Sequence, residues 1–300
     1  MSMTARLAAF SACFLWAISF IATKQALLAV PPLTVVTLRL VIAALCFLTW
    51  ICVMQMTRRD SPVLWRNFDR RTFFRLALLS TVGAGLHYGT QTIGLQYTTA
   101  SNASLYAVTA PITIVVLAAV FLGEPISRLK FFGIVIAILG VLTVMGWQTL
   151  MTLELTSHLV GDLLVMASIV MWGIFTVFGK KITDEMGAMP VIAGVTIIGA
   201  IWMLPVGWVE SRNLGFSLLS IPINAWLALV FLGAGCCFLA TLLYFIALEQ
   251  SESQKVGAYL YTIPPMTAVV AAFYLGEQLS MTFFAGSALV FFGVFLTDRG

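Results

Sequence analysis

The chain has 300 residues, of which 61% are hydrophobic and only 9% are charged, with a formal net charge of +4 at pH 7. Soluble domains carry about 25% charged residues. This composition therefore excludes a protein whose whole surface faces water, and no long polar stretch could form a separate soluble domain.

Ten apolar stretches are near the length of about 17–25 residues that crosses a bilayer as a helix. In chain order they are 5–24, 33–56, 73–95, 101–122, 129–147, 160–180, 190–209, 225–247, 256–275 and 282–298. The first stretch follows a single positive charge, lacks a small-residue cleavage site and is too long for the core of a signal peptide, so we expect it to belong to the fold. The sequence predicts an all-α membrane protein with ten transmembrane helices.

Positive charges set the expected orientation, because Lys and Arg mark the cytoplasmic side. With the N-terminus inside, inner segments hold 13 of the 16 Lys and Arg residues, and outer segments hold Lys24, Arg39 and Arg212. Both termini are therefore expected inside. The basic cluster at 58–75 is interpreted as an inner loop that contacts anionic lipid, and no nucleic-acid partner is expected.

The second half of the chain repeats the first. Tyr106 recurs 153 residues later as Tyr259, and the same offset relates the following pairs: Thr109 and Thr262, Pro111 and Pro264, Glu124 and Glu277, Gly133 and Gly286, Gly140 and Gly293. Each half, 1–150 and 151–300, holds five predicted spans, and five is odd. We therefore expect two inverted five-helix repeats, with a substrate site between them near the midplane.

Prolines interrupt two matching spans. Pro111 lies about halfway along the fourth predicted span, and Pro264 and Pro265 lie at the matching place in the ninth. A proline inside a helix removes one hydrogen bond and displaces the carbonyl four residues earlier. The carbonyls expected to be free are those of Ala107, Leu260 and Tyr261. Either they line a cavity and accept a ligand ammonium, or the prolines form a packing kink or hinge.

Aromatic and polar residues near the middle of spans are the candidate substrate contacts. Trp16 and Trp172 lie mid-span, where an indole N–H needs a partner, so they either line the pathway or pack in the core. Thr176 follows Trp172 by one turn. The third span holds His87, Tyr88 and Gln91, and the histidine either contacts substrate or bonds a carbonyl. Tyr106 and Tyr259 complete the expected cavity.

The residue types that are missing from the middle of the spans limit which solutes and which coupling ions the protein could use. No Asp or Glu lies mid-span, so only His87 could relay a proton. Arg39 and Lys24 lie within about two turns of the outer surface, where long side chains can extend to the interface. The expected cavity suits a neutral or zwitterionic solute with an apolar part. A metal site is not expected, because the other histidine, His158, is in an outer loop, and no enzyme or cofactor motif is found.

The repeated motifs resemble the drug/metabolite transporter superfamily, in its ten-helix EamA-type branch. The likeness rests on a tryptophan and a following lysine in spans 1 and 6, the prolines of spans 4 and 9, a Leu-Gly-Glu after each, and glycines seven apart in spans 5 and 10. The motif residues not yet named are Lys180, Leu122-Gly123 and Leu275-Gly276. The resemblance implies a basket of ten helices in the bacterial inner membrane, with spans 5 and 10 set aside for packing. Many relatives export amino acids, and the expected cavity resembles that of the YddG type of aromatic amino acid exporter.

The sequence therefore predicts a metabolite exporter that works by alternating access, transports its solute without coupling to an ion, and bends near its prolines. Glu124 and Glu277, at span ends, are interpreted as caps or gating contacts. Rivals are a drug/proton antiporter or nucleotide-sugar carrier of the same fold, an intramembrane enzyme, and a scaffold without a cavity. Expected partners are a small-molecule substrate and the lipid bilayer. The Gly85-x-x-x-Gly89 spacing allows helix packing or self-association, so a monomer or weak dimer is expected.

Overall fold

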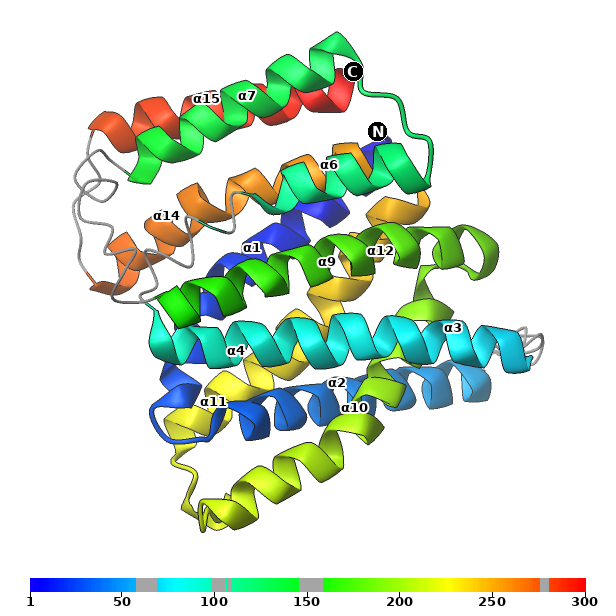
Figure 1. Cartoon of the computed structure of the whole chain (residues 1–300), viewed down its shortest axis with the longest axis vertical. Helices are drawn as coiled ribbons and strands as arrows, with labels where there is room; N and C mark the ends of the chain where they lie inside the picture. Colours follow the sequence, from blue (N-terminus) through cyan, green and yellow to red (C-terminus); the bar gives the residue numbers. More distant parts are fainter. Residues whose placement is uncertain (58–68, 99–105, 107–108, 146–158, 276–280) are drawn as a thin grey trace.

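The computed structural model describes residues 1–57, 69–98, 106, 109–145, 159–275 and 281–300, and every regular element within them is a helix (Figure 1). The helices of the first half are α1 (Met3–Leu27), α2 (Pro32–Thr57), α3 (Arg70–Ser80), η1 (Thr81–His87), α4 (Tyr88–Tyr97), α6 (Ala110–Phe121) and α7 (Arg128–Met145). Those of the second half are α9 (Leu159–Met186), α10 (Ala188–Asn213), η2 (Leu218–Ser220), α11 (Ile223–Val230), η3 (Phe231–Ala240), α12 (Thr241–Glu249), α13 (Ser253–Ala258), η4 (Tyr259–Thr262), α14 (Ile263–Leu275) and α15 (Met281–Arg299).

Six of the described helical rods are long and apolar enough to cross a membrane. They are α1, α2, α9, α10, α15 and the rod Ile223–Glu249 formed by α11, η3 and α12. Large apolar side chains such as Phe14, Leu45 and Trp202 point outward from these rods, as expected of a surface in contact with lipid. The prediction of an all-helical, multi-pass membrane protein is confirmed.

Helices α7 and α15 lie side by side at one edge of the molecule (Figure 1). Glycines bring their backbones together: a Cβ built on Gly140 would lie 2.6 Å from the Val290 nitrogen and 2.8 Å from the Gly286 oxygen. A Cβ on Gly133 would lie 2.7 Å from the Gly293 oxygen. Because Gly133 meets Gly293 and Gly140 meets Gly286, the two helices run antiparallel. The glycines seven apart therefore serve close helix packing within the chain.

The third and eighth predicted spans are not plain α-helices. In the first of these rods α3 passes into the π-helix η1 and then into α4, and in the other α11 passes into the π-helix η3 and then into α12. Each π segment contains a Gly-Ala-Gly sequence, at 83–85 and 233–235. A Cβ on Gly83 would overlap the Phe175 ring, and one on Gly233 would lie 2.6 Å from Ile42. The small residues thus let neighbouring helices approach the widened turns.

Pro111 lies in the first turn of α6, which corrects the expectation that it interrupts a helix interior, whereas Pro264 and Pro265 lie inside the continuous helical stretch formed by α13, η4 and α14, as expected. Pro111 follows the first residue of α6, and Pro264 and Pro265 follow the first residue of α14. At the start of α6 the missing N–H costs nothing. The turn before α14 tightens into the 3₁₀-helix η4, and the Ile263 N–H donates to the Leu260 carbonyl, so that carbonyl is not free. Ala107 lies outside the described residues.

Gly140→Ala is expected to lower the melting temperature of the purified protein in detergent, because its new methyl group meets the backbone of α15 rather than a movable side chain. Overpacking of this kind costs about 1–3 kcal/mol. Gly89→Ala is the matched control, because the nearest atom to its new Cβ is 3.9 Å away. Equal melting temperatures for the two variants would contradict the close packing of α7 on α15.

Candidate functional site

Two tryptophans from opposite halves of the chain meet in the interior. Trp16 of α1 and Trp172 of α9 pack edge to face with ring centroids 5.1 Å apart. Tyr244 of α12 completes the group, 5.1 Å from Trp16 and 5.6 Å from Trp172. The tryptophans are only 9% and 7% exposed. The sequence placed both indoles mid-span but did not predict that they touch.

The junction of η1 and α4 brings two more predicted residues to this group. The His87 ring lies 5.1 Å from Trp172 and 4.9 Å from Tyr88. We call Trp16, Trp172, Tyr244, His87 and Tyr88 the central aromatic cluster. It draws on four separate rods and on both halves of the chain.

The His87 Nδ1 lies 2.8 Å from the Ser168 carbonyl oxygen. A carbonyl can only accept, so Nδ1 carries the hydrogen, and Nε2 of the neutral ring is left as an acceptor. The structure thus contains the carbonyl bond that the sequence left open as one alternative. The same residue remains in ring contact with Trp172, so its bond also fixes the orientation of the imidazole in the cluster.

Hydroxyl groups beside the cluster lack hydrogen bonds. Thr176 Oγ1 and Tyr244 Oη are both buried and lie close to one another, but neither makes a hydrogen bond of normal geometry in the described part of the chain. Thr92, one turn beyond Tyr88 in α4, has a similarly unpaired hydroxyl. An unpaired buried hydroxyl costs about 1–3 kcal/mol. Groups of this kind are suited to accept or donate a bond to a polar solute or to water.

Three predicted contacts lie outside the cluster. Gln91 is partly exposed on α4, and Tyr106 is partly exposed in the chain before α6. Tyr259 is buried in η4, where it accepts a bond at its carbonyl from the Thr262 side chain. The Thr109 side chain donates the same hydrogen bond to the Tyr106 carbonyl, so the repeated residues also make equivalent hydrogen bonds.

Arg39 differs from its expected placement. It does not extend to the outer interface but is 3% exposed, with its guanidinium 4.2 Å from the centre of the Tyr88 ring. A fixed positive charge therefore lies next to the central aromatic cluster. Sequence reasoning missed this because distance from the span end cannot say which face of the helix carries a side chain.

Glutamates join one helix end to the start of another. Glu124, just after α6, accepts bonds from the Ser253 and Gln254 backbone nitrogens at 2.7 and 3.0 Å, at the start of α13. The Gln254 amide donates to the Glu124 carbonyl at 2.9 Å. A carboxylate at a helix N-terminus is favoured by the unpaired N–H groups and the helix dipole. Glu277, its counterpart in the repeat, lies outside the described residues.

Two further glutamates do the same at other helix starts, and the sequence analysis did not single them out. Glu210 of α10 accepts from the Leu33 and Thr34 nitrogens, at 3.1 and 2.6 Å. Glu249 of α12 accepts from the Ala188 nitrogen at 2.9 Å. The sequence feature that could have identified these two residues is a glutamate at the end of an apolar stretch.

On the side of the molecule with the termini, ionic contacts join several elements. Arg6 pairs with Asp298 at 2.7 Å, which ties α1 to the end of α15. Lys130 of α7 pairs with Glu252 and donates to the Pro125 carbonyl. We call these two pairs and the Glu124 contacts with α13 the terminal-side latch. The N- and C-termini lie near one another at this end of the rods (Figure 1).

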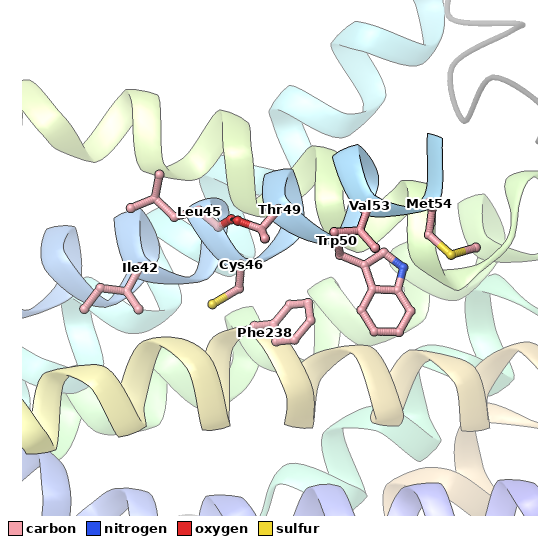
Figure 2. Close-up of a pocket in the computed structure, with 8 residues that line it drawn as sticks. All are labelled: Ile42, Leu45, Cys46, Thr49, Trp50, Val53, Met54 and Phe238. Atoms are coloured by element: carbon pink, nitrogen blue, oxygen red, sulfur yellow. The ribbon is translucent and has the colours of Figure 1, made fainter. Parts of the chain in front are cut away.

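An apolar pocket between α2 and η3 is unrelated to the cluster. Figure 2 shows its lining side chains, which are those of Ile42, Leu45, Cys46, Thr49, Trp50, Val53, Met54 and Phe238. None of them is a predicted substrate contact, and none is charged. We assign this pocket to the lipid-facing surface.

Residues 3–146 and 159–298 each match the EamA-like transporter family. The chain belongs to this family. The resemblance to the drug/metabolite transporter superfamily is thereby confirmed, and the protein is a membrane transporter.

Several named relatives are similar along most of the chain. An uncharacterized transporter of Archaeoglobus fulgidus is 27% identical, covering 95% of both chains. The uncharacterized transporter YvbV of Bacillus subtilis is also 27% identical, over 95% of this chain and 88% of its own. A probable terminal-alkyne amino-acid exporter of Streptantibioticus cattleyicolor is 28% identical, over 79% of this chain and 77% of its own. A solved crystal structure with 19% identity covers 100% of this chain and 98% of its own with a TM-score of 0.80, which shows the shared fold.

A double-mutant cycle should detect the contact between the tryptophans. Trp16→Leu and Trp172→Leu together are expected to cost less than the sum of their separate effects, with a coupling of about 0.5–1.5 kcal/mol for an edge-to-face pair. The measurement is the free energy of unfolding in detergent. Trp16→Leu combined with Trp202→Leu is the control, because Trp202 is exposed on α10 and should be additive. Additivity in both cycles would rule out the Trp16–Trp172 contact.

Proposed function

We propose that this EamA-family protein exports small metabolites, most readily neutral or aromatic amino acids, across a bacterial inner membrane. The central aromatic cluster is the observation that carries the proposal. Its rings offer faces for an apolar side chain, and the unpaired hydroxyls of Thr176 and Tyr244 offer polar contacts beside them. The amino-acid exporter among the relatives supports this substrate class.

The proposed architecture is ten transmembrane helices in two inverted repeats, 1–150 and 151–300, with both termini in the cytoplasm. The reciprocal contacts of α7 with α15 support it, because equivalent glycines exchange partners across an antiparallel pair, as a two-fold relation requires. The π segments support it too: adding the 153-residue offset to His87, the last residue of η1, gives Ala240, the last residue of η3. The Arg6–Asp298 ion pair is consistent with both termini on one side.

Transport would proceed by alternating access of the central cluster. The terminal-side latch holds α6 to α13 and α1 to α15, so this side would be the closed, cytoplasmic one. The helix starts at Pro111 and at Pro264-Pro265 would be the bending points, with Gln91, Tyr106 and Tyr259 facing the solute in another state. No carboxylate contacts the described cluster, which favours facilitative transport without proton coupling.

The same fold could instead carry lipophilic drug cations in exchange for protons, or nucleotide sugars. The neutral, carbonyl-bonded His87 and the nearby Arg39 disfavour the cation exchanger. An intramembrane enzyme is disfavoured because the relatives quoted above are named as transporters.

Labelled phenylalanine should enter liposomes that contain the purified protein, with or without an imposed pH gradient. Unlabelled tryptophan should compete, and Trp172→Ala should abolish uptake because it removes the ring shared by the cluster. Trp202→Ala, on the lipid-facing surface, is the control and should transport normally. Uptake that requires the gradient would overturn the uncoupled mechanism, and no uptake in either condition would eliminate phenylalanine as substrate.

Breaking the terminal-side latch should expose the interior from that side. In a variant whose only cysteine is the buried Cys13 of α1, Glu124→Ala is expected to speed maleimide labelling about tenfold, because it removes charge-assisted hydrogen bonds worth about 1.5–3 kcal/mol. The readout is the labelling rate in vesicles with the cytoplasmic side outward.

Glu185→Ala is the matched control for this labelling. It breaks the Arg75–Glu185 pair, which joins α3 to α9 and is not part of the latch. The rate should stay unchanged in this variant. Equal rates in the Glu124 and Glu185 variants would refute the latch.

A further inference from the structure

A buried arginine lacks an anionic partner among the residues that the structure describes. Arg39 lies in the second turn of α2, and its Nε donates to Cys237 Sγ at 3.1 Å. Its guanidinium stacks over Tyr88 at 4.2 Å. Within the described residues, its two terminal nitrogens make no hydrogen bond and no salt bridge with a carboxylate.

These contacts do not compensate for burial of the charge. A thiol is a weak acceptor, and a cation–π contact contributes about 0.5–2 kcal/mol. A buried ion without a partner costs several kcal/mol. The site is therefore electrostatically incomplete, and an anion placed against the two free nitrogens would complete it.

The chemistry of the free end favours a carboxylate. The planar guanidinium presents parallel N–H donors at a spacing that matches the two oxygens of a carboxylate, which gives a bidentate pair. With Nε held by Cys237 and one face covered by Tyr88, the side chain is fixed in orientation. A guanidinium that is already fixed in orientation loses little conformational freedom when it binds a carboxylate.

The position of Arg39 connects this charge to the aromatic cluster. Tyr88, under the guanidinium, is in ring contact with His87, and His87 is in ring contact with Trp172. A solute whose carboxylate binds Arg39 can therefore place an apolar group on the same series of rings. Other arginine–aromatic contacts differ: Arg212 over Trp208 is exposed at the end of α10 and needs no anion.

We propose that Arg39 binds the carboxylate of the transported solute and so selects solutes that carry one. This inference rests on the proposed function, since it assigns a polar group of the amino acid to one residue. It also explains how the central aromatic cluster, together with Arg39, would distinguish an amino acid from an amine with the same side chain.

The test compares three ligands that share a phenyl group. Binding of L-phenylalanine, 3-phenylpropionate and 2-phenylethylamine to the purified protein is measured by titration calorimetry in wild type, Arg39→Gln and Arg39→Lys. The first two ligands carry a carboxylate and the third does not. Arg212→Gln is the matched control, because it also removes an arginine from an aromatic face.

The expected result is a loss of affinity for both carboxylates of about tenfold or more in Arg39→Gln. Arg39→Lys should lose less affinity, because it keeps the positive charge but not the two parallel N–H donors. This variant replaces Arg39→Gln in the test if the glutamine variant does not fold. Arg212→Gln should bind like wild type. Equal losses for the amine and the carboxylates would indicate a structural role and overturn the proposal, as would a wild type that binds neither carboxylate.

The outcomes separate this proposal from the proposed function. If 3-phenylpropionate binds through Arg39 but phenylalanine is not transported, the carboxylate site stands and amino-acid export fails. If Arg39→Gln binds and transports phenylalanine like wild type, export stands and the role of Arg39 is disproved.

Discussion

The lack of water in the membrane interior is the constraint on which this structure depends, because every buried polar group must find its partner within the protein. Helix starts are the hardest case, since each leaves unpaired N–H groups. Here Glu124, Glu210 and Glu249 each supply a carboxylate to the start of a different helix. Each of these hydrogen bonds pairs a free N–H group at a helix start and also joins two helices. The need to pair backbone groups therefore also fixes how the helices are arranged.

The interior follows the same rule with other groups. His87 is bonded to a carbonyl, and Arg39 lies against a ring and a thiol. Among the described residues, the rule is not fully met at the free end of Arg39 and at the Thr176 and Tyr244 hydroxyls beside the aromatic cluster, nor at other buried hydroxyls such as those of Thr183, Tyr261 and Ser287.

Much of the fold could be predicted from the sequence because it is set by composition and periodicity. Apolar length located the helices, and the repeat offset identified the glycines that bring α7 against α15. Contacts between spans could not be read in the same way. The meeting of Trp16 with Trp172 and the inward direction of Arg39 depend on helix rotation, which length and charge do not specify. Pro111 was located correctly in the chain but misassigned, because a sequence cannot distinguish a bent helix from a new one that begins at the proline.

The π segments have a consequence for how the third and eighth rods present their side chains. A π turn accommodates about one more residue than an α turn. Since successive residues of an α-helix are rotated by about 100°, the part of the rod after η1 is turned relative to α3 by about that angle. One side of α3 packs against α10, whereas the stretch beginning at His87 and Tyr88 faces α9 and α2. A single added residue thus lets one continuous rod direct its first half to α10 and its second half to the central aromatic cluster.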